Sequence, residues 1–203
     1  MGEGIRSALK WVAHVTATAI VAPMVVSFHL RAYLIGGRRA LSGSTQLLAL
    51  VPGLTGQYLR RAFLGCVLAH CDRTCAIEFG SIFSDPGARV DAGAYIGPYS
   101  HIGLAHIQRD ALLGAGVHVP SGPMTHGIAD MTRPIREQPG TPMLVTIGAG
   151  AWVGSGAIVM ADVGAETIVG AGAVVTRPIP DRVIAGGIPA TVLRSRVAVP
   201  VAR

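Results

Sequence analysis

The chain has 203 residues, enough for one or two domains with a buried core, and its formal net charge is +6. All of the excess charge lies in residues 1–76, which hold eight basic and two acidic side chains, whereas residues 77–203 hold nine of each. Aromatic residues make up only 5% of the chain and do not alternate with arginines as they do in surfaces that stack on bases. This composition argues against nucleic-acid binding.

The first third of the chain contains two apolar segments. Residues 11–30 (WVAHVTATAIVAPMVVSFHL) carry no charge over twenty residues, the length of a membrane span, and lie between Lys10 and Arg31. Two histidines, three hydroxyl side chains and Pro23 weaken a transmembrane interpretation, because Pro23 should break a helix near its middle. Residues 44–69 form a second apolar run that is interrupted by Pro, Gly and two arginines.

The basic residues at both ends of residues 11–30 give the positive-inside rule no asymmetry with which to orient a single span. We therefore expect residues 1–76 to be an apolar, basic helical region that associates with one leaflet of a membrane, as a peripheral or monotopic anchor or a re-entrant hairpin. Two alternatives stay open. One is a signal peptide, for which no convincing cleavage site follows, and the other is a soluble helical pair packed on the rest of the protein or on a neighbouring subunit.

Three cysteines, Cys66, Cys71 and Cys75, lie close together in the sequence with His70 beside them. Structural zinc sites use two closely spaced cysteine pairs separated by a longer loop, and this cluster has no second pair. We therefore expect reduced cysteines that pack as small hydrophobic side chains in a reducing compartment, and no bound metal.

Beyond residue 76, large apolar residues recur every six positions, with a slip of a residue or two between groups, and a small residue usually follows each of them. A period of six fits neither an α-helix nor the alternation of an open sheet, but it fits a solenoid in which one hexamer makes one flat side. The predicted inward-facing residues are Ile77, Phe83, Val90, Ile96, Ile102, Ile107, Leu113, Val119, Ile147, Val153, Val159, Val163, Val169 and Val175.

The repeat stops at residues 120–144, which are rich in Pro and charged residues and contain a single histidine, His126. Coils of a solenoid stack about 4.8 Å apart and leave no room for extra residues inside, so this segment must loop outward. Loops on a rigid scaffold often carry catalytic groups.

Three segments of the repeat region resemble the hexapeptide-repeat acyltransferases, in particular the O-acetyltransferases of the maltose and galactoside type. They are residues 147–160 (IGAGAWVGSGAIVM), 169–180 (VGAGAVVTRPIP) and 185–196 (AGGIPATVLRSR). The resemblance implies a mainly β fold, a left-handed parallel β-helix over residues 77–203 with the outward loop 120–144 and a C-terminal tail. Its left-handed crossover departs from the usual rule for parallel strands and is taken from the resemblance alone.

The same resemblance implies a homotrimer that transfers an acetyl group from acetyl-CoA to a hydroxyl of a saccharide or of a lipid-linked glycan precursor, without a metal. Residues 124–134 (MTHGIADMTRP) match the family's catalytic loop and place His126 at the catalytic histidine. A neutral imidazole is suited to remove the proton of an attacking hydroxyl near pH 7, so His126 is the expected general base. The candidates to orient its ring are Asp130, Glu137 and a backbone carbonyl.

Further residues are assigned to binding by the resemblance. Trp152 would border the acceptor or thioester pocket, although a packing role on the next coil is an equal alternative. The residues that would contact the pantetheine arm or the nucleotide end of acetyl-CoA are Ser155, Ala171, Gly172, Thr176, Arg177 and Arg194. Because acetyl-CoA is cytosolic, the coil must lie on the cytoplasmic side, at the inner membrane.

Two other functions stay open. His101 and His106 have a spacing found in β-helical carbonic anhydrases, where histidines of adjacent subunits bind zinc, but the sequence after His106 lacks the expected continuation. The other is a non-catalytic trimeric scaffold, which would require His126 to be idle.

Overall fold

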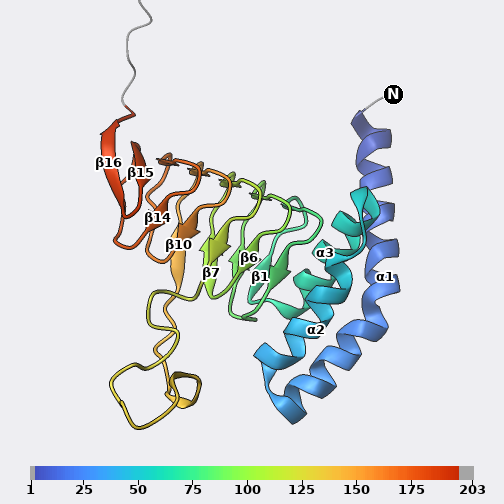
Figure 1. Ribbon diagram of the computed structural model, residues 1–203. Coiled ribbons are helices and arrows are strands. Elements are labelled where there is room, and N and C mark those ends of the chain that lie inside the picture. Colours follow the sequence, from blue (N-terminus) through green and yellow to red (C-terminus); the bar gives the residue numbers. More distant parts are fainter. Residues whose placement is uncertain (1–2, 197–203) are drawn as a thin grey trace, which may run out of the picture.

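A computed structural model of the protein describes residues 3–196, so residues 197–203 of the predicted C-terminal tail lie outside the described part. Three helices come first, α1 (Glu3–Ile35), α2 (Gly37–Ala49) and α3 (Gly53–Val67). A parallel β-solenoid of about six turns follows, with the helices at its beginning and a long excursion part-way along it (Figure 1). A mainly β solenoid preceded by an apolar helical region is the predicted fold.

The solenoid has three flat sides, each a parallel sheet to which successive coils contribute one strand. Sheet A consists of β1 (His70–Cys71), β4 (Arg89–Val90), β7 (Ala105–Ile107) and β10 (Val145–Ile147). Sheet B consists of β2 (Ala76–Ile77), β5 (Tyr95–Ile96), β8 (Leu112–Leu113), β11 (Trp152–Val153), β13 (Ile168–Val169), β15 (Val183–Gly187) and the antiparallel β16 (Ala190–Ser195). Sheet C consists of β3 (Ile82–Phe83), β6 (His101–Ile102), β9 (His118–Val119), β12 (Ile158–Val159) and β14 (Val174–Val175).

The core of the solenoid is formed by the residues that recur with period six. All fourteen predicted inward-facing positions, from Ile77 to Val175, are at most 1% exposed. They stack on one another along the axis, as in the pairs Val90 with Ile107 and Val153 with Val169. The prediction that the hexapeptide period marks the inward-facing residues is therefore confirmed. Burial of such apolar side chains is the main favourable term in folding.

The helices α2 and α3 close the open end of the first coil. Thr45 of α2 donates a hydrogen bond to the carbonyl oxygen of Phe83 at 3.0 Å, and Gln57 of α3 donates one to the carboxylate of Glu78 at 2.7 Å. The first coil itself begins at β1, which pairs with β4, a few residues before the boundary of residue 76 expected from the sequence. The helical region and the coil therefore share a continuous interface.

Helix α1 continues through Pro23, so the break expected there does not occur. A proline inside a helix costs roughly 3 kcal/mol, because it removes a hydrogen bond and crowds the preceding turn. Ala17, Val21 and Phe28, on both sides of the proline, are buried, and the Phe28 ring meets the ring of Phe63 of α3 edge-on. This packing keeps the helix whole across Pro23.

The rest of α1 is apolar and exposed. Its large exposed side chains are Leu9, Trp11, Val12, Val15, Ile20, Val26, Leu30, Tyr33, Leu34 and Ile35. Residues 7–35 are long and apolar enough to cross a membrane, and only 17% of their most apolar 18-residue window is buried. The helix thus has one narrow packing face and a wide unpartnered apolar face.

Candidate active site

The outward loop, residues 120–144, leaves the coil after β9 of sheet C and returns at β10 of sheet A. It therefore occupies the corner between these two sheets and hangs away from the solenoid (Figure 1). Residues 160–162 and then 176–178 turn the same corner in the next two coils, because β12 and β14 continue sheet C in register with β9. Thr176 and Arg177 thus lie on the edge from which the loop projects.

Gln138 organises the inside of this loop. Its side chain is 7% exposed and donates hydrogen bonds to the carbonyl oxygens of Asp130 at 2.7 Å and Arg133 at 3.0 Å. It also accepts one from the backbone N–H of Asp130 at 3.0 Å. Three bonds from one buried amide give a short loop a fixed shape without a hydrophobic core. Sequence reasoning missed Gln138, because nothing in the sequence separates it from the other polar residues around it.

His126 lies on the first arm of the loop, paired across it with Pro139 in a short antiparallel bridge. Its side chain is exposed. Neither predicted orienting carboxylate reaches it within the chain, since Asp130 accepts hydrogen bonds from Thr132 at 2.9 and 2.6 Å and Glu137 lies 3.5 Å from Arg136. The backbone thus fixes the position of His126, and its ring is accessible to a substrate or to a side chain of another subunit.

Trp152 is on a different side of the solenoid. It belongs to β11, between Leu112 of β8 and Ile168 of β13, and its side chain points outward with 51% exposed. The chain therefore does not bring Trp152 of sheet B together with His126, which lies on the corner between sheets C and A.

Ser155, Ala171 and Gly172 lie together on the corner between sheets B and C. The N–H of Gly172 donates to the carbonyl oxygen of Ser155 at 2.9 Å, which joins consecutive coils. A side chain at Gly154 would collide with the backbone of Ala171, and Gly172 has a positive φ of 66°. Small residues are required here by the coil itself, and they also leave exposed backbone beside a narrow edge.

The two predicted phosphate ligands lie near the C-terminal end of the solenoid. Arg177 follows β14 on the corner between sheets C and A, and Arg194 lies on β16, opposite Ile184 of β15. Both side chains are exposed, as is Thr176. Two guanidinium groups at one end of the solenoid are available to an anion.

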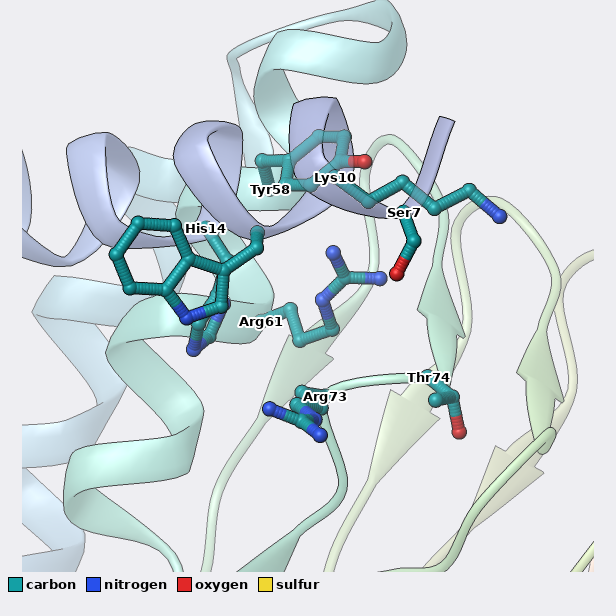
Figure 2. Close-up of a pocket in the computed structure, with 8 residues that line it drawn as sticks. Ser7, Lys10, His14, Tyr58, Arg61, Arg73 and Thr74 are labelled. Atoms are coloured by element: carbon teal, nitrogen blue, oxygen red, sulfur yellow. The ribbon is translucent and has the colours of Figure 1, made fainter. Parts of the chain in front are cut away.

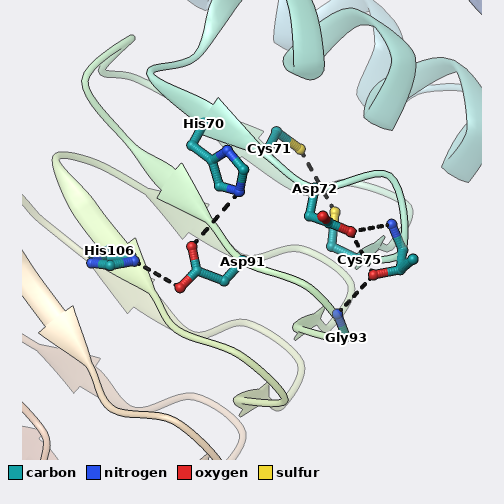
Figure 3. Close-up of polar contacts among 8 residues, drawn as sticks. His70, Cys71, Asp72, Cys75, Asp91, Gly93 and His106 are labelled. Carbon is teal, nitrogen blue, oxygen red and sulfur yellow. Dashed lines mark hydrogen bonds and ion pairs between the residues drawn. The ribbon is translucent and has the colours of Figure 1, made fainter.

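The histidines of the carbonic anhydrase alternative are separated in the fold. His101 lies on sheet C, where its ring stacks on that of His118 at 4.9 Å with an angle of 6°. His106 lies on sheet A, and its Nε2 is 2.9 Å from the carboxylate of Asp91, which also lies 3.9 Å from His70 (Figure 3). His101 and His106 thus lie on different sheets, and each contacts a different side chain, His118 and Asp91 respectively.

The cysteine cluster also divides. The sulfurs of Cys71 and Cys75 lie 3.7 Å apart, and Figure 3 marks their contact with a dashed line. Cys66, in contrast, is exposed on α3 and does not pack as a small hydrophobic residue. Its position differs from the expectation because residues 66 and 71 fall on either side of the turn from helix to coil. Within residues 3–196, no group of three or more His, Cys, Asp and Glu side chains is arranged to hold a metal ion.

A comparison with models of protein families gave no match, and neither did one with curated proteins. Solved structures do match. An acetyltransferase with hexapeptide repeats from Vibrio cholerae, complexed with acetyl coenzyme A, superposes with a TM-score of 0.56 at 18% identity, over 81% of this chain and 90% of the other. The protein has the hexapeptide-repeat acyltransferase fold.

Two further structures of this fold carry ligands. A galactoside acetyltransferase in complex with coenzyme A matches with a TM-score of 0.54 at 20% identity, over 78% of this chain and 80% of the other. AntD, an N-acyltransferase from Bacillus cereus in complex with dTDP-4-amino-4,6-dideoxyglucose and coenzyme A, matches with a TM-score of 0.52 at 18% identity, over 61% and 71% of the two chains. All three are acyltransferases that bind a coenzyme A compound.

Proposed function

We propose that the protein is an O-acetyltransferase that transfers an acetyl group from acetyl-CoA to a hydroxyl of a saccharide or of a lipid-linked glycan precursor. The observation that carries this proposal is the placement of His126 on a loop that Gln138 shapes, projecting from a corner of a hexapeptide-repeat coil. Solved proteins of this fold hold coenzyme A, and one of them also holds a nucleotide sugar. Their acceptors include amines, so the hydroxyl acceptor is the part of the proposal that rests on the resemblance of the loop.

In this mechanism His126 acts as the general base. Its neutral imidazole takes the proton of the acceptor hydroxyl as the oxygen attacks the thioester carbonyl. The tetrahedral intermediate then collapses and its C–S bond breaks. The imidazolium of His126 gives its proton to the leaving sulfur, so coenzyme A departs as the free thiol and the imidazole is neutral again. Such a base contributes on the order of 10²- to 10⁴-fold to the rate.

The donor would lie along the corners of the coil. The pantetheine arm is extended and carries two amides, which suits the exposed backbone beside Ser155, Ala171 and Gly172. Thr176 stands on the next corner, across β14. Arg177 and Arg194 would hold the phosphates at the nucleotide end, because planar guanidinium groups bind phosphate oxygens in pairs.

We further propose a homotrimer. His126 and Trp152 lie on separate sides of one chain, so a site that uses both needs walls from two subunits. The loop also exposes apolar side chains that a lone chain leaves in water, with Ile128 at 62%, Met131 at 93% and Ile135 at 58%. A closed threefold ring of prisms would cover these side chains and complete the site.

The unpartnered apolar face of α1 supports association with a membrane. Because acetyl-CoA is cytosolic, the coil would stay on the cytoplasmic face of the inner membrane, with α1 peripheral or monotopic in one leaflet. A trimer would present three such helices and gain avidity from them.

The reaction is tested by the release of free coenzyme A thiol. The full-length protein in mild detergent is offered acetyl-CoA and longer acyl-CoA donors against sugars, sugar amines and lipid-linked saccharides. We expect thiol release that depends on a hydroxyl acceptor and is fastest with acetyl-CoA. Turnover with amine acceptors alone would contradict O-acetylation, and the absence of turnover with every acceptor would contradict the enzyme assignment.

A further inference from the structure

A cavity lies where α1, α3 and the first coil meet, on elements other than those that carry His126. It has a volume of about 350 Å³. Lys10 of α1, Arg61 of α3 and Arg73 of the turn between β1 and β2 all line it (Figure 2). Three cationic side chains from separate parts of the chain thus line one space. None of the roles assigned to the active site uses them.

The cavity contains no counter-charge of its own. None of the described residues that line it is acidic. The nearest carboxylate along the chain, Asp72, is engaged with the N–H and hydroxyl of Thr74 at 2.7 and 2.6 Å. A space that is lined by three cations and by no described carboxylate has a positive potential, which attracts an anion.

Two buried nitrogen atoms in the cavity wall also lack partners. Nδ1 of His14 and Nε of Arg61 are inaccessible to solvent and form no hydrogen bond within the described residues. The Arg61 side chain is nevertheless held in place, because its guanidinium lies 4.5 Å from the ring centre of Tyr58 and donates to the carbonyl oxygen of Cys75 at 3.1 Å. Buried polar atoms without partners are costly, and these two belong to side chains that line the cavity.

The surroundings of His14 fit a site for an anion. Burial lowers the pKa of His14 from its ordinary value, and the positive charges of Arg61 and Arg73 lower it further. A bound anion would offset that repulsion and offer an acceptor to the imidazole. The hydroxyl of Ser7, which also lines the cavity, adds one more donor.

The position of the cavity indicates where the anion comes from. Ser7, Lys10, Trp11 and His14 line it at intervals of three and four residues, so they form one stripe along α1. Trp11 belongs both to this stripe and to the exposed apolar surface of the helix, where it is 62% exposed. Tryptophan and basic side chains beside an apolar helix face are the arrangement found at the level of lipid headgroups.

We propose that this cavity binds the phosphate monoester headgroup of a membrane lipid. Three cations and the hydroxyl of Ser7 match a compact dianion with three terminal oxygens, and the adjacent apolar face of α1 matches the acyl chains to which it is attached. This site rests on the membrane association proposed above and is independent of the acyl transfer. The cavity would make membrane binding selective for one headgroup, whereas the apolar face of α1 alone would bind any lipid.

The test measures binding of the full-length protein to vesicles. Phosphatidylcholine vesicles that contain phosphatidic acid are compared with vesicles that contain phosphatidylserine at matched surface charge, and with pure phosphatidylcholine. We expect at least fivefold tighter binding to phosphatidic acid. Arg73→Ala and Lys10→Ala, both at exposed positions, should each reduce that preference about fivefold, whereas Arg109→Ala, which removes an exposed arginine elsewhere, should leave it unchanged.

Three results would overturn the proposal. Equal binding to the two anionic vesicles would show charge attraction without a headgroup site. If Arg109→Ala and Arg73→Ala reduced the preference for phosphatidic acid equally, the preference would not depend on the cavity. Inorganic phosphate that displaces the protein from phosphatidic acid at the same concentration as the lipid would indicate a site for the free ion. The thiol-release assay runs without vesicles, so failure of this site and failure of acyl transfer are distinguishable.

Discussion

Nε of Arg60 lies 2.9 Å from the carbonyl oxygen of Ile77, which joins α3 to the first coil of the solenoid. The same side chain is 2% exposed, and its Nη1 donates to the carbonyl oxygens of Leu48 and Val51 at 3.0 and 2.8 Å. Burial lowers the pKa of Arg60 from its ordinary value, while the nearby carboxylate of Glu78 raises it. A buried cation is tolerated here because three carbonyl oxygens surround it.

Arg60→Met should therefore destabilise the protein by about 3 kcal/mol, because it keeps much of the side-chain volume but leaves buried carbonyl oxygens without donors. The measurement is the free energy of unfolding in guanidinium chloride, in detergent. Arg39→Met, at an exposed position of α2, is the matched control and should change it by less than about 0.5 kcal/mol. Equal stability of both variants would show that the helices are not anchored through Arg60.

His126→Ala should lower kcat by at least about 10²-fold and leave the affinity for coenzyme A and the melting temperature unchanged. The reason is that His126 is the proposed general base, and its exposed ring is not part of the packed core. Thiol release gives the rate, and calorimetry gives the affinity for coenzyme A. His70→Ala, a partly exposed histidine on β1, is the control for the loss of an imidazole. Near-normal turnover in His126→Ala would remove the assigned base.

Much of this architecture follows from the sequence for a simple reason. A hexapeptide period places an apolar residue at every inward position, so periodicity alone identifies the coils from Ile77 onward. The first coil escapes detection at β1, because its position opposite Val90 is taken by Cys71 and not by a large aliphatic residue. The helix break predicted at Pro23 is wrong for a different reason, because the packing of α1 on α3 decides whether the helix continues.

The candidate site was predictable only in its parts. A motif resemblance selects His126 and Trp152, but their separation on different sides of the solenoid depends on which sheet each segment joins. The bonds that Gln138 makes depend on a loop conformation that no local pattern encodes. The cavity at Lys10, Arg61 and Arg73 combines three elements that are far apart in the chain, and it is visible only once they are packed.

Gln138→Ala should reduce turnover by about tenfold or more without lowering the melting temperature of the coil, because the amide holds only the loop. The backbone around Asp130 would lose its partners, and His126 would no longer be held in one place. Limited proteolysis should show faster cleavage within residues 120–144. A variant with intact loop protection and reduced turnover would contradict a purely positioning role, as would normal turnover with a cleaved loop.

Stability should fall as the pH drops below about 6.5. Burial lowers the folded-state pKa of both His101 and His118, and for His101 the neighbouring His118 lowers it further. Protonation therefore favours the unfolded chain, whose histidines keep the ordinary value of 6.5, so the stability is present above that pH and is lost as the pH falls through the folded-state pKa values.

Melting temperatures at pH 7 and pH 5 check this expectation. His118→Gln removes one ring of the stacked pair and should shrink the difference between the two pH values. His29→Gln, at an exposed position on α1, should leave the difference as it is in the parent protein. If His118→Gln also leaves it unchanged, the acid sensitivity arises elsewhere.

The proposed trimer predicts both a mass and a dependence of activity on the loop surface. After subtraction of bound detergent, light scattering should give three times the chain mass of 20.9 kDa. Met131→Asp and Ile128→Asp replace apolar side chains that a neighbouring subunit would cover with charged ones. Each substitution should both favour monomers and lower turnover. Leu50→Asp, at the end of α2, should change neither, since Leu50 is 71% exposed, between Ile128 at 62% and Met131 at 93%. A monodisperse monomer with full activity would show that one chain completes the site alone, and Trp152 would then have no part in it.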